Sequence, residues 1–493
     1  MNIIQIHPED NVAVALHPVH IGEAVTAGTV TVTAQEEIPG GHKIAMKPIS
    51  RGDSVVKYGN PIAVATSDIE PGAWVHTHNA RTGLSEGGEY HYEHKTYTLP
   101  QVSEKTIQGY RRKDGSVGIR NEIWVLPIVG CINGIAKTLV EKNQYLVNGT
   151  VEGLYEFSHP FGCSQLGDDL AMTRRVLADL VRHPNAGGVL CIGLGCENLT
   201  MDQFLDELGP YDEDRVKFML CQQVDDELET GSKLLEQLAA YAGQFHRETV
   251  PASELVIGLK CGGSDGLSGI TANPVVGRFS DRLIAAGGTT VLTEVPEMFG
   301  AENILFSRCE SEEVFQEAVR MVNDFKTYFV AHGQVVYENP SPGNKEGGIT
   351  TLEDKSCGCV QKGGSAQVVD VLDYAMPVKK KGLNLLSGPG NDLVSATNLT
   401  ASGSHMVLFT TGRGTPFGAP APTVKLSTNT PLFEKKRDWI DFNTGTVADG
   451  TETLDEAADR LFEYVLDVAS GRKTNTERRG YREISIFKDG VVL

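Results

Sequence analysis

Two patterns of hydrophobic and polar positions divide the chain. Up to about residue 98, short runs alternate apolar and polar residues, as in NVAVAL and TVTVTA, and glycine and proline separate them. Alternation with a period of two is typical of half-buried strands, and glycine and proline mark the turns between them. The pattern predicts a small β-rich domain over residues 1–98.

From residue 117, continuous apolar runs alternate with amphipathic segments. Each run is followed by a stretch with helical spacing, and the runs cover 123–131, 153–163, 187–196, 216–221 and 255–261. Such a rhythm predicts a largely parallel sheet with helices on both faces, that is, an α/β body.

Breaks in this rhythm predict the domain boundaries. A polar stretch predicts a linker over 99–116, and a second break near residue 250 predicts two α/β units. The first, 117–250, is of flavodoxin-like type, and the second, 251–493, follows it. Apolar spacing predicts helices over 311–333 and 453–471, whereas the glycine-rich stretch 339–364 reads as irregular loops.

Composition narrows the class of protein. Of the 493 residues, 40% are hydrophobic and 22% charged, which is typical of a soluble folded protein. A formal charge of −20 argues against nucleic acid or an anionic membrane as a partner. The first residues lack the pattern of a signal peptide, and nine cysteines favour reduced thiols, so we expect a cytoplasmic protein.

A cysteine ends each of the five predicted strands, namely Cys131, Cys163, Cys196, Cys221 and Cys261. Ligands of open α/β sheets bind beyond the carboxyl ends of the strands, where helix N-termini lower the pKa of thiols. The alternative is that each cysteine is a small buried hydrophobic residue.

Histidines and lysines in the first hundred residues are candidates for a site. His76 and His78 are two apart and would share one face of a strand, where they suit a divalent metal or a base beside a metal. His42 follows a glycine turn, and Lys43 and Lys57 could bind a carboxylate. Surface histidines and a solvated lysine face are the alternatives.

Three further features could bind an anionic substrate or transfer a proton. Arg120 precedes the first parallel strand and could clamp a carboxylate, and His159 lies in the motif SHPFGCSQLGDD. The stretch GLKCGGSDGLSGITANP, from Gly258 to Pro274, could expose backbone N–H groups to an oxyanion or hydroxyl. The alternative for this stretch is a tight connection that requires positive φ angles.

These motifs together resemble the altronate/galactarate dehydratase family of sugar-acid hydro-lyases. GHKIA, VKYGNPI and VHTHN resemble the SAF-type N-terminal module of the family. GIRNEIWVLPIVGCINGIA, SHPFGCSQLGDD, CGGSDGLSGITANP, TEVPEMFGAE and TTGRGTP resemble its catalytic body. The resemblance implies an iron(II)-type divalent metal, with Mn²⁺ as an alternative, and elimination of water from an aldonate or aldarate in hexuronate catabolism. For altronate the product would be 2-dehydro-3-deoxy-D-gluconate.

The resulting hypothesis assigns roles to individual residues. The candidates for catalysis are His42, His76, His78 and His159. The candidates for substrate binding are Lys43, Lys57, Arg120, Asn121, Ser264, Asp265 and Asn273. Soft ligands favour Fe²⁺ over Mg²⁺, and the candidate metal ligands are His76, His78, Cys131, Cys163, Cys196, Cys261 and Cys359.

Several alternatives remain open at this point. The chain could be a galactarate dehydratase or a sulfo-lyase, it could hold an iron–sulfur cluster, or it could bind a sugar acid without turnover. In each case the expected partner is a small-molecule sugar acid, with no nucleic acid and no membrane. A homo-oligomer, with a dimer as the simplest form, is compatible with the sequence.

Overall fold

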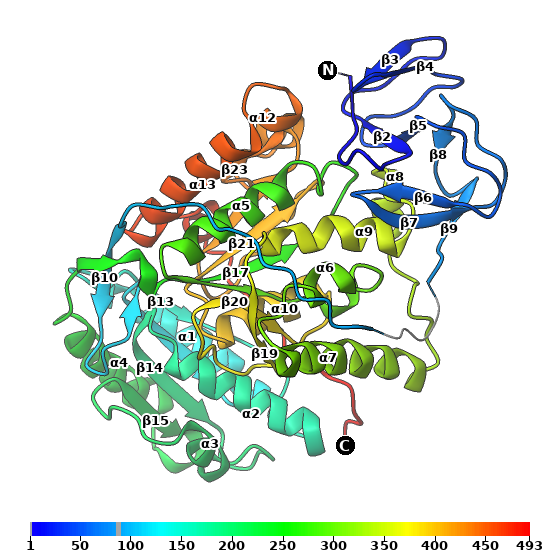
Figure 1. The fold of residues 1–493 in the computed structure, drawn as a ribbon. Coiled ribbons are helices and arrows are strands. Elements are labelled where there is room, and N and C mark those ends of the chain that lie inside the picture. Colours follow the sequence, from blue (N-terminus) through cyan, green and yellow to red (C-terminus); the bar gives the residue numbers. More distant parts are fainter. Residues whose placement is uncertain (1, 85–89) are drawn as a thin grey trace.

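The N-terminal region consists of short antiparallel strands, as the alternating pattern predicted. The computed structural model describes residues 2–84 and 90–493 (Figure 1). One sheet has the order β1 (Ile3–Ile4), β2 (Val12–Ala15), β5 (Lys43–Ala45) and β8 (Trp74–Val75). A second sheet contains β6 (Ser54–Lys57), β7 (Asn60–Ala65) and β9 (Ala80–Arg81), and a hairpin contains β3 (Ala24–Ala27) and β4 (Val30–Thr33).

The first α/β unit is a four-stranded parallel sheet, which confirms the strand–helix prediction. Its order is β13 (Gly153–Glu156), β12 (Glu122–Pro127), β14 (Ala186–Gly193) and β15 (Val216–Leu220). Two separate apolar cores cover its faces. One contains side chains of α1 (Asn133–Lys142) and α4 (Glu227–Ala242), and the other those of α2 (Gly167–Arg182) and α3 (Met201–Leu208).

The second α/β unit is a seven-stranded parallel sheet. Its order is β19 (Val368–Leu372), β20 (Gly382–Leu386), β18 (Thr289–Leu292), β17 (Val256–Cys261), β21 (Met406–Thr411), β22 (Thr423–Ser427) and β23 (Phe442–Asn443). The longer helices of this unit are α5 (Ala272–Ala285), α7 (Glu312–Ala331), α10 (Asp392–Ala401) and α13 (Leu454–Ala469). The predicted helices over 311–333 and 453–471 correspond to α7 and α13. The shorter ones are α6 (Glu302–Phe306), α8 (Pro342–Glu346), α9 (Leu352–Cys359), α11 (Thr430–Lys435), α12 (Gly445–Ala448) and α14 (Asn475–Arg479).

Two segments are more regular than the sequence suggested. The expected linker contains β10 (Thr106–Arg111) and the following residues contain β11 (Val117–Gly118), and β10 pairs with both β11 and β16 (Glu248–Pro251). The stretch 339–364, interpreted as loops, contains α8 and α9. Thr351 caps α9 because its side chain accepts a hydrogen bond from the backbone N–H of Asp354.

Buried histidines lie where the two α/β units meet. The Nε2 atom of His183 is 3.1 Å from the carbonyl oxygen of Ser404, and the Nδ1 atom of His405 accepts a hydrogen bond from Val256 N–H at 3.0 Å. Burial lowers the pKa of His183 to about 3 and that of His405 to about 4. Across the described residues, no helix is both long enough and apolar enough to span a bilayer.

We expect His405→Asn to flatten the pH dependence of the unfolding free energy. Folded His405 stays neutral down to about pH 4, whereas the unfolded chain takes up the proton near its ordinary pKa. Stability therefore falls with acid, by about 1.4 kcal/mol per pH unit between these two pKa values. Asparagine keeps an acceptor for Val256 but binds no proton. Urea unfolding at several pH values measures the slope, with exposed His17→Asn as the control, and equal slopes in the wild type and His405→Asn would contradict the assignment.

Candidate functional site

The strand order of the seven-stranded sheet indicates where a ligand would bind. From β17 the chain continues to β18 on one side, and it later returns to β21 on the other side. In open parallel sheets, ligands bind beyond the carboxyl ends of the strands at such a reversal. Here β17 ends at Cys261. The N-terminal domain lies against this end of the sheet, where its strand β7 packs on helix α9 of the second α/β unit (Figure 1).

The glycine-rich stretch after β17 allows the N-terminal domain to approach closely. A Cβ atom on Gly266 would lie 1.9 Å from the carbonyl oxygen of Gly41, and one on Gly269 would lie 2.1 Å from the hydroxyl of Tyr58. Neither contact would tolerate a side chain. The glycines are thus required for packing between the domains, and oxyanion binding by this loop stays a prediction.

Two lysines from the N-terminal domain share one carboxylate of α9. The Nζ atoms of Lys43 and Lys57 lie 2.7 and 3.1 Å from the two carboxyl oxygens of Asp354. All three side chains are 3% exposed or less. Two ammonium groups on one carboxylate leave an excess positive charge in a buried place.

The pKa values reflect this imbalance. Burial lowers the pKa of Lys43 to about 8, although Asp354 opposes the effect. Burial also acts on Lys57 and Asp354, but their mutual attraction outweighs it, so the pKa of Lys57 is raised and that of Asp354 lies well below its usual range. An anionic substrate would neutralise the excess charge.

Two thiols lie beside this cluster. The Sγ atom of Cys261 is 2.7 Å from the hydroxyl of Ser264, and Cys359, the last residue of α9, donates to Glu297 at 3.1 Å. The neighbouring thiol of Cys359 lowers the pKa of Cys261 to about 5, against the effect of burial and with help from Lys362. The interaction with Cys261, together with burial, raises the pKa of Cys359. Cys261 is therefore the thiolate of the pair, and Cys359 keeps its proton, which it donates to Glu297.

Buried ion pairs surround the thiols. Lys355 lies 2.8 Å from Glu297, and Lys362 lies 3.3 Å from Glu294, which also pairs with Lys260. Burial raises the pKa of Glu294 to about 7 against the attraction of Lys260. We call Lys43, Lys57, Asp354, Lys355, Cys261 and Cys359, with these ion pairs, the lysine–thiol site.

The three N-terminal histidines lie close together in the structure, but their ring nitrogens have different hydrogen-bond partners. The rings of His42 and His76 are 5.0 Å apart, and Trp74 lies against both of these rings and against His78. Nδ1 of His42 accepts from the indole N–H of Trp74, so Nε2 carries the proton and donates to the carbonyl of Glu346 at 3.2 Å. His42 thus has no free lone pair for a metal. Nδ1 of His76 is 3.1 Å from the hydroxyl of Thr350.

The described residues do not fit the predicted metal site. Among residues 2–84 and 90–493, no three His, Cys, Asp or Glu side chains are grouped so that they could hold an ion. The carboxylates of the lysine–thiol site are already paired with lysines. Cys131, Cys163 and Cys196 are exposed beside the four-stranded sheet, whereas Cys261 and Cys359 are buried beside the seven-stranded one. Iron dependence therefore stays a prediction.

Other candidates lie in structural networks. Arg120 is buried and donates to Glu477 at 2.7 Å, and Asn121 accepts from Arg112 at 2.8 Å. In His159, Nε2 lies 2.7 Å from the carbonyl oxygen of Pro127 and Nδ1 accepts from Phe161 N–H. These contacts occupy Arg120 and both ring nitrogens of His159. Their proposed substrate and catalytic roles stay untested.

Ser264, Asp265 and Asn273 do lie at the site. Together with Lys57, Tyr58, Asp354, Lys355 and Cys359 they line one small pocket. The side chain of Asp265 accepts from Thr428 at 2.8 Å, and Asn273 bonds to the carbonyl of Gly358 at 3.0 Å. The side chains of Asp265 and Asn273 therefore connect the segments that line the pocket.

The sequence analysis missed the acid and the lysines that organise the site. Asp354 and Lys355 were placed in a loop, and Lys260 and Lys362 were not considered. One signal was available, because T-L-E-D at 351–354 has the spacing of a helix cap followed by an acid at the third position. Nothing in the sequence shows that Asp354 meets two lysines that lie 297 and 311 residues before it.

Comparison with known proteins places the chain in a family. Family models match three segments, described as the altronate/galactarate dehydratase SAF domain at 1–83, the D-galactarate dehydratase/altronate hydrolase second domain at 109–243, and the D-galactarate/altronate dehydratase C-terminal domain at 252–492. The chain is 53% identical to the altronate dehydratase of Escherichia coli and 50% identical to that of Bacillus subtilis, with all of both chains covered. The chain belongs to the altronate/galactarate dehydratase family. The galactarate dehydratase (L-threo-forming) of Escherichia coli is 34% identical, with 99% of this chain and 97% of the relative covered.

Membership accounts for the arrangement of the site. The lysine–thiol site joins the matched SAF segment to the matched C-terminal segment, since Lys43 and Lys57 belong to the first and Asp354 to the second. The resemblance inferred from the sequence motifs is confirmed, and so is an α/β body that follows a β-rich SAF domain.

Proposed function

We propose that this chain removes water from D-altronate and forms 2-dehydro-3-deoxy-D-gluconate. The observation that carries the proposal is the identity of 50% or more, over the full length of both chains, to two altronate dehydratases. The site agrees with an anionic substrate, because the ammonium-bearing residues Lys57 and Lys355 line a small pocket at the carboxyl end of β17.

Dehydration of a 2,3-dihydroxy acid requires three things of the protein. The proton on C2 must be removed, the charge that develops on the carboxylate must be stabilised, and the hydroxyl on C3 must leave. A preorganised cation in a water-poor site stabilises developing charge far better than water does. The ammonium groups of Lys57 and Lys355 are placed for this role.

The thiol pair is the base in this proposal. Cys261 is the thiolate of the pair, and the proton that the pair takes from C2 of the substrate passes to the C3 hydroxyl, which leaves as water. Cys359 lines the pocket, and Cys261 is held behind it by Ser264 and by the carboxyl end of β17. A base within hydrogen-bond reach typically contributes about 10²–10⁴-fold to the rate.

Turnover of D-altronate tests the proposal directly. The 2-keto product, trapped with semicarbazide, should form from D-altronate in preference to galactarate and sulfolactate. If galactarate or sulfolactate is turned over in preference to D-altronate, then that acid is the substrate and the proposal is wrong. Binding of all three acids without product would make the chain a sugar-acid binding protein.

Iron dependence is predicted from the family resemblance alone. We expect a chelator to lower the rate at least tenfold, and Fe²⁺ or Mn²⁺ to restore it. Because no three donors of the described chain are grouped around an ion, the substrate would have to supply the remaining ligands. Metal analysis of anaerobically purified protein should accompany the assay, and full activity in metal-free protein would refute the dependence.

A further inference from the structure

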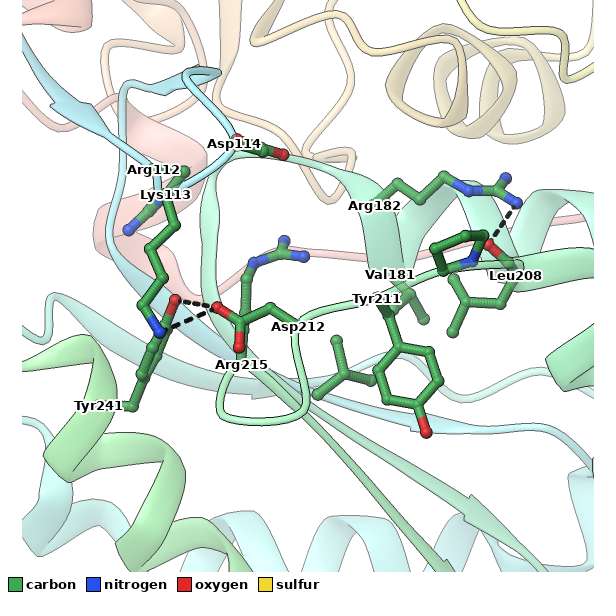
Figure 2. Close-up of a pocket in the computed structure, with 12 residues that line it drawn as sticks. Arg112, Lys113, Asp114, Val181, Arg182, Leu208, Tyr211, Asp212, Arg215 and Tyr241 are labelled. Atoms are coloured by element: carbon green, nitrogen blue, oxygen red, sulfur yellow. Dashed lines mark hydrogen bonds and ion pairs between the residues drawn. The ribbon is translucent and has the colours of Figure 1, made fainter.

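A second cavity lies in the first α/β unit. It encloses about 300 Å³ between the turn after β10, the end of α2, the connection from α3 to β15, and α4 (Figure 2). Sites for small metabolites begin at about this size. Its lining shares no residue with the pocket of the lysine–thiol site.

One wall of the cavity carries a buried guanidinium that lacks an acidic partner. Arg112 is 5% exposed and donates to the carbonyl oxygens of Pro184 and Arg120 and to the side-chain oxygen of Asn121, at 2.8–2.9 Å. All three acceptors are neutral. Arginine has five N–H donors, so two remain for a further acceptor.

A second guanidinium at the cavity, that of the half-buried Arg215, also lacks an acidic ion-pair partner among the described residues. Arg215 donates to the carbonyl oxygens of Ala186 and His183 at 3.1 and 2.8 Å. Within the part of the chain that the structure describes, neither Arg215 nor Arg112 forms an ion pair, and three N–H groups of Arg215 have no acceptor there. Figure 2 shows Arg215 between the side of the cavity that carries Arg112 and the side that carries Arg182.

Two acids, Asp114 and Asp212, line the cavity and form hydrogen bonds or ion pairs with residues other than the two arginines. Asp212 accepts from the hydroxyl of Tyr241 at 2.6 Å and lies 3.3 Å from Lys113 (Figure 2). Asp114 accepts from the backbone and hydroxyl of Ser116. Burial, with repulsion from Arg215, lowers the pKa of Arg112 to about 9. Asp114 and Asp212 also attract Arg215, but Arg112, Lys113 and Arg215 outnumber these two carboxylates at the cavity, and this excess of positive charge favours an anion there.

We propose that this cavity binds a small organic anion, with a phosphate or carboxylate group between Arg112 and Arg215. Guanidinium groups bind both oxyanions through paired hydrogen bonds. The less polar part of the ligand would lie against Leu208, Pro210 and Tyr211, which form the apolar wall. A local excess of positive charge on a chain with a net charge of −20 makes the site selective for anions.

The site also contacts the boundary between the α/β units. Arg215 donates to the carbonyl of His183, and the ring of His183 contacts Ser404 of the other unit. An anion that holds Arg215 would therefore stabilise the first α/β unit at its interface with the second. We expect the melting temperature of the full chain to rise when the anion binds.

Calorimetric titration of the full chain with inorganic phosphate and with citrate tests the proposal. At least one of the two should bind at millimolar concentration or below, and the one that binds tighter identifies the preferred oxyanion. Arg215→Gln should weaken binding at least tenfold, and so should Tyr211→Glu, which places a negative charge on an exposed wall position and leaves both arginines intact. The second variant keeps the test valid if the first does not fold.

Two further variants control the titration. Arg174→Gln, in the same unit but paired with Glu207 outside the cavity, should bind like the wild type. Lys57→Met should also keep the binding, which separates this cavity from the lysine–thiol site. The proposal is overturned if neither anion binds the wild type, if Arg215→Gln and Tyr211→Glu bind as the wild type does, or if Lys57→Met abolishes the binding.

Discussion

Lys57→Met is expected to lower kcat/KM for D-altronate by about 10²–10³-fold, the typical effect of removing one preorganised group that stabilises developing charge. Lys57 lines the pocket at the carboxyl end of β17, and its ammonium group is held by Asp354 at 3.1 Å. Methionine has a similar length and no charge, so the pocket keeps its shape. Steady-state assays with semicarbazide detection of the product measure the change.

A matched variant separates catalysis from folding. Lys326 is also buried and paired, with Glu302 at 2.8 Å, but it lies on α7 outside the lysine–thiol site. Lys326→Met removes the same type of ion pair and should leave kcat/KM within a few-fold of the wild type. A similar loss in both variants would show that Lys57 acts only through stability.

Asp354→Asn is expected to lower the unfolding free energy at neutral pH by about 3–5 kcal/mol, because it leaves two buried ammonium groups without a carboxylate. Lys43 and Lys57 come from the N-terminal domain, and Asp354 belongs to the catalytic body. The loss should therefore appear first as detachment of the N-terminal domain. Hydrogen exchange of β5 and β6, together with urea unfolding, measures both effects.

The triple variant Lys43→Met, Lys57→Met, Asp354→Leu provides the contrast. Replacing a whole buried ionic cluster by apolar residues is often neutral or stabilising. The triple variant should thus be more stable than Asp354→Asn, although it should be inactive. If Asp354→Asn is as stable as the wild type, then the cluster does not join the two domains as described.

The pH dependence of the cluster follows from the same charges. The pKa of Asp354 lies well below its ordinary value in the folded chain. Its contribution to stability is therefore present above the ordinary pKa of an aspartate and is lost as the pH falls through the depressed value. Around neutral pH the carboxylate stays ionised, so the attachment of the N-terminal domain does not weaken there.

Hydrophobic periodicity predicted the fold well because burial determines it. The run 187–196 is apolar throughout, and β14 is buried at every position. The alternation in 29–34 corresponds to β4 of the β3–β4 hairpin, in which Val32 is buried between exposed Thr31 and Thr33. Such patterns are local, and a single segment is enough to reveal them.

The site was harder to predict because its contacts are not local. Lys43 and Lys57 were expected to bind the carboxylate of a substrate. In the structure both pair with Asp354 of the chain itself, and their binding to a substrate stays a prediction. Cysteines at strand ends suggested one shared ligand set, but the chain folds into two separate parallel sheets, and only Cys261 meets Cys359. Local spacing contains no information about which strand ends face each other.

A crystal structure with the 3-deoxy analogue of D-altronate, which lacks the leaving hydroxyl, tests the central claim most directly. The account predicts that the carboxylate of the analogue lies within hydrogen-bond distance of Nζ of Lys57, in the pocket that Ser264 and Cys359 line. An analogue bound elsewhere, with this pocket unchanged, would contradict the account.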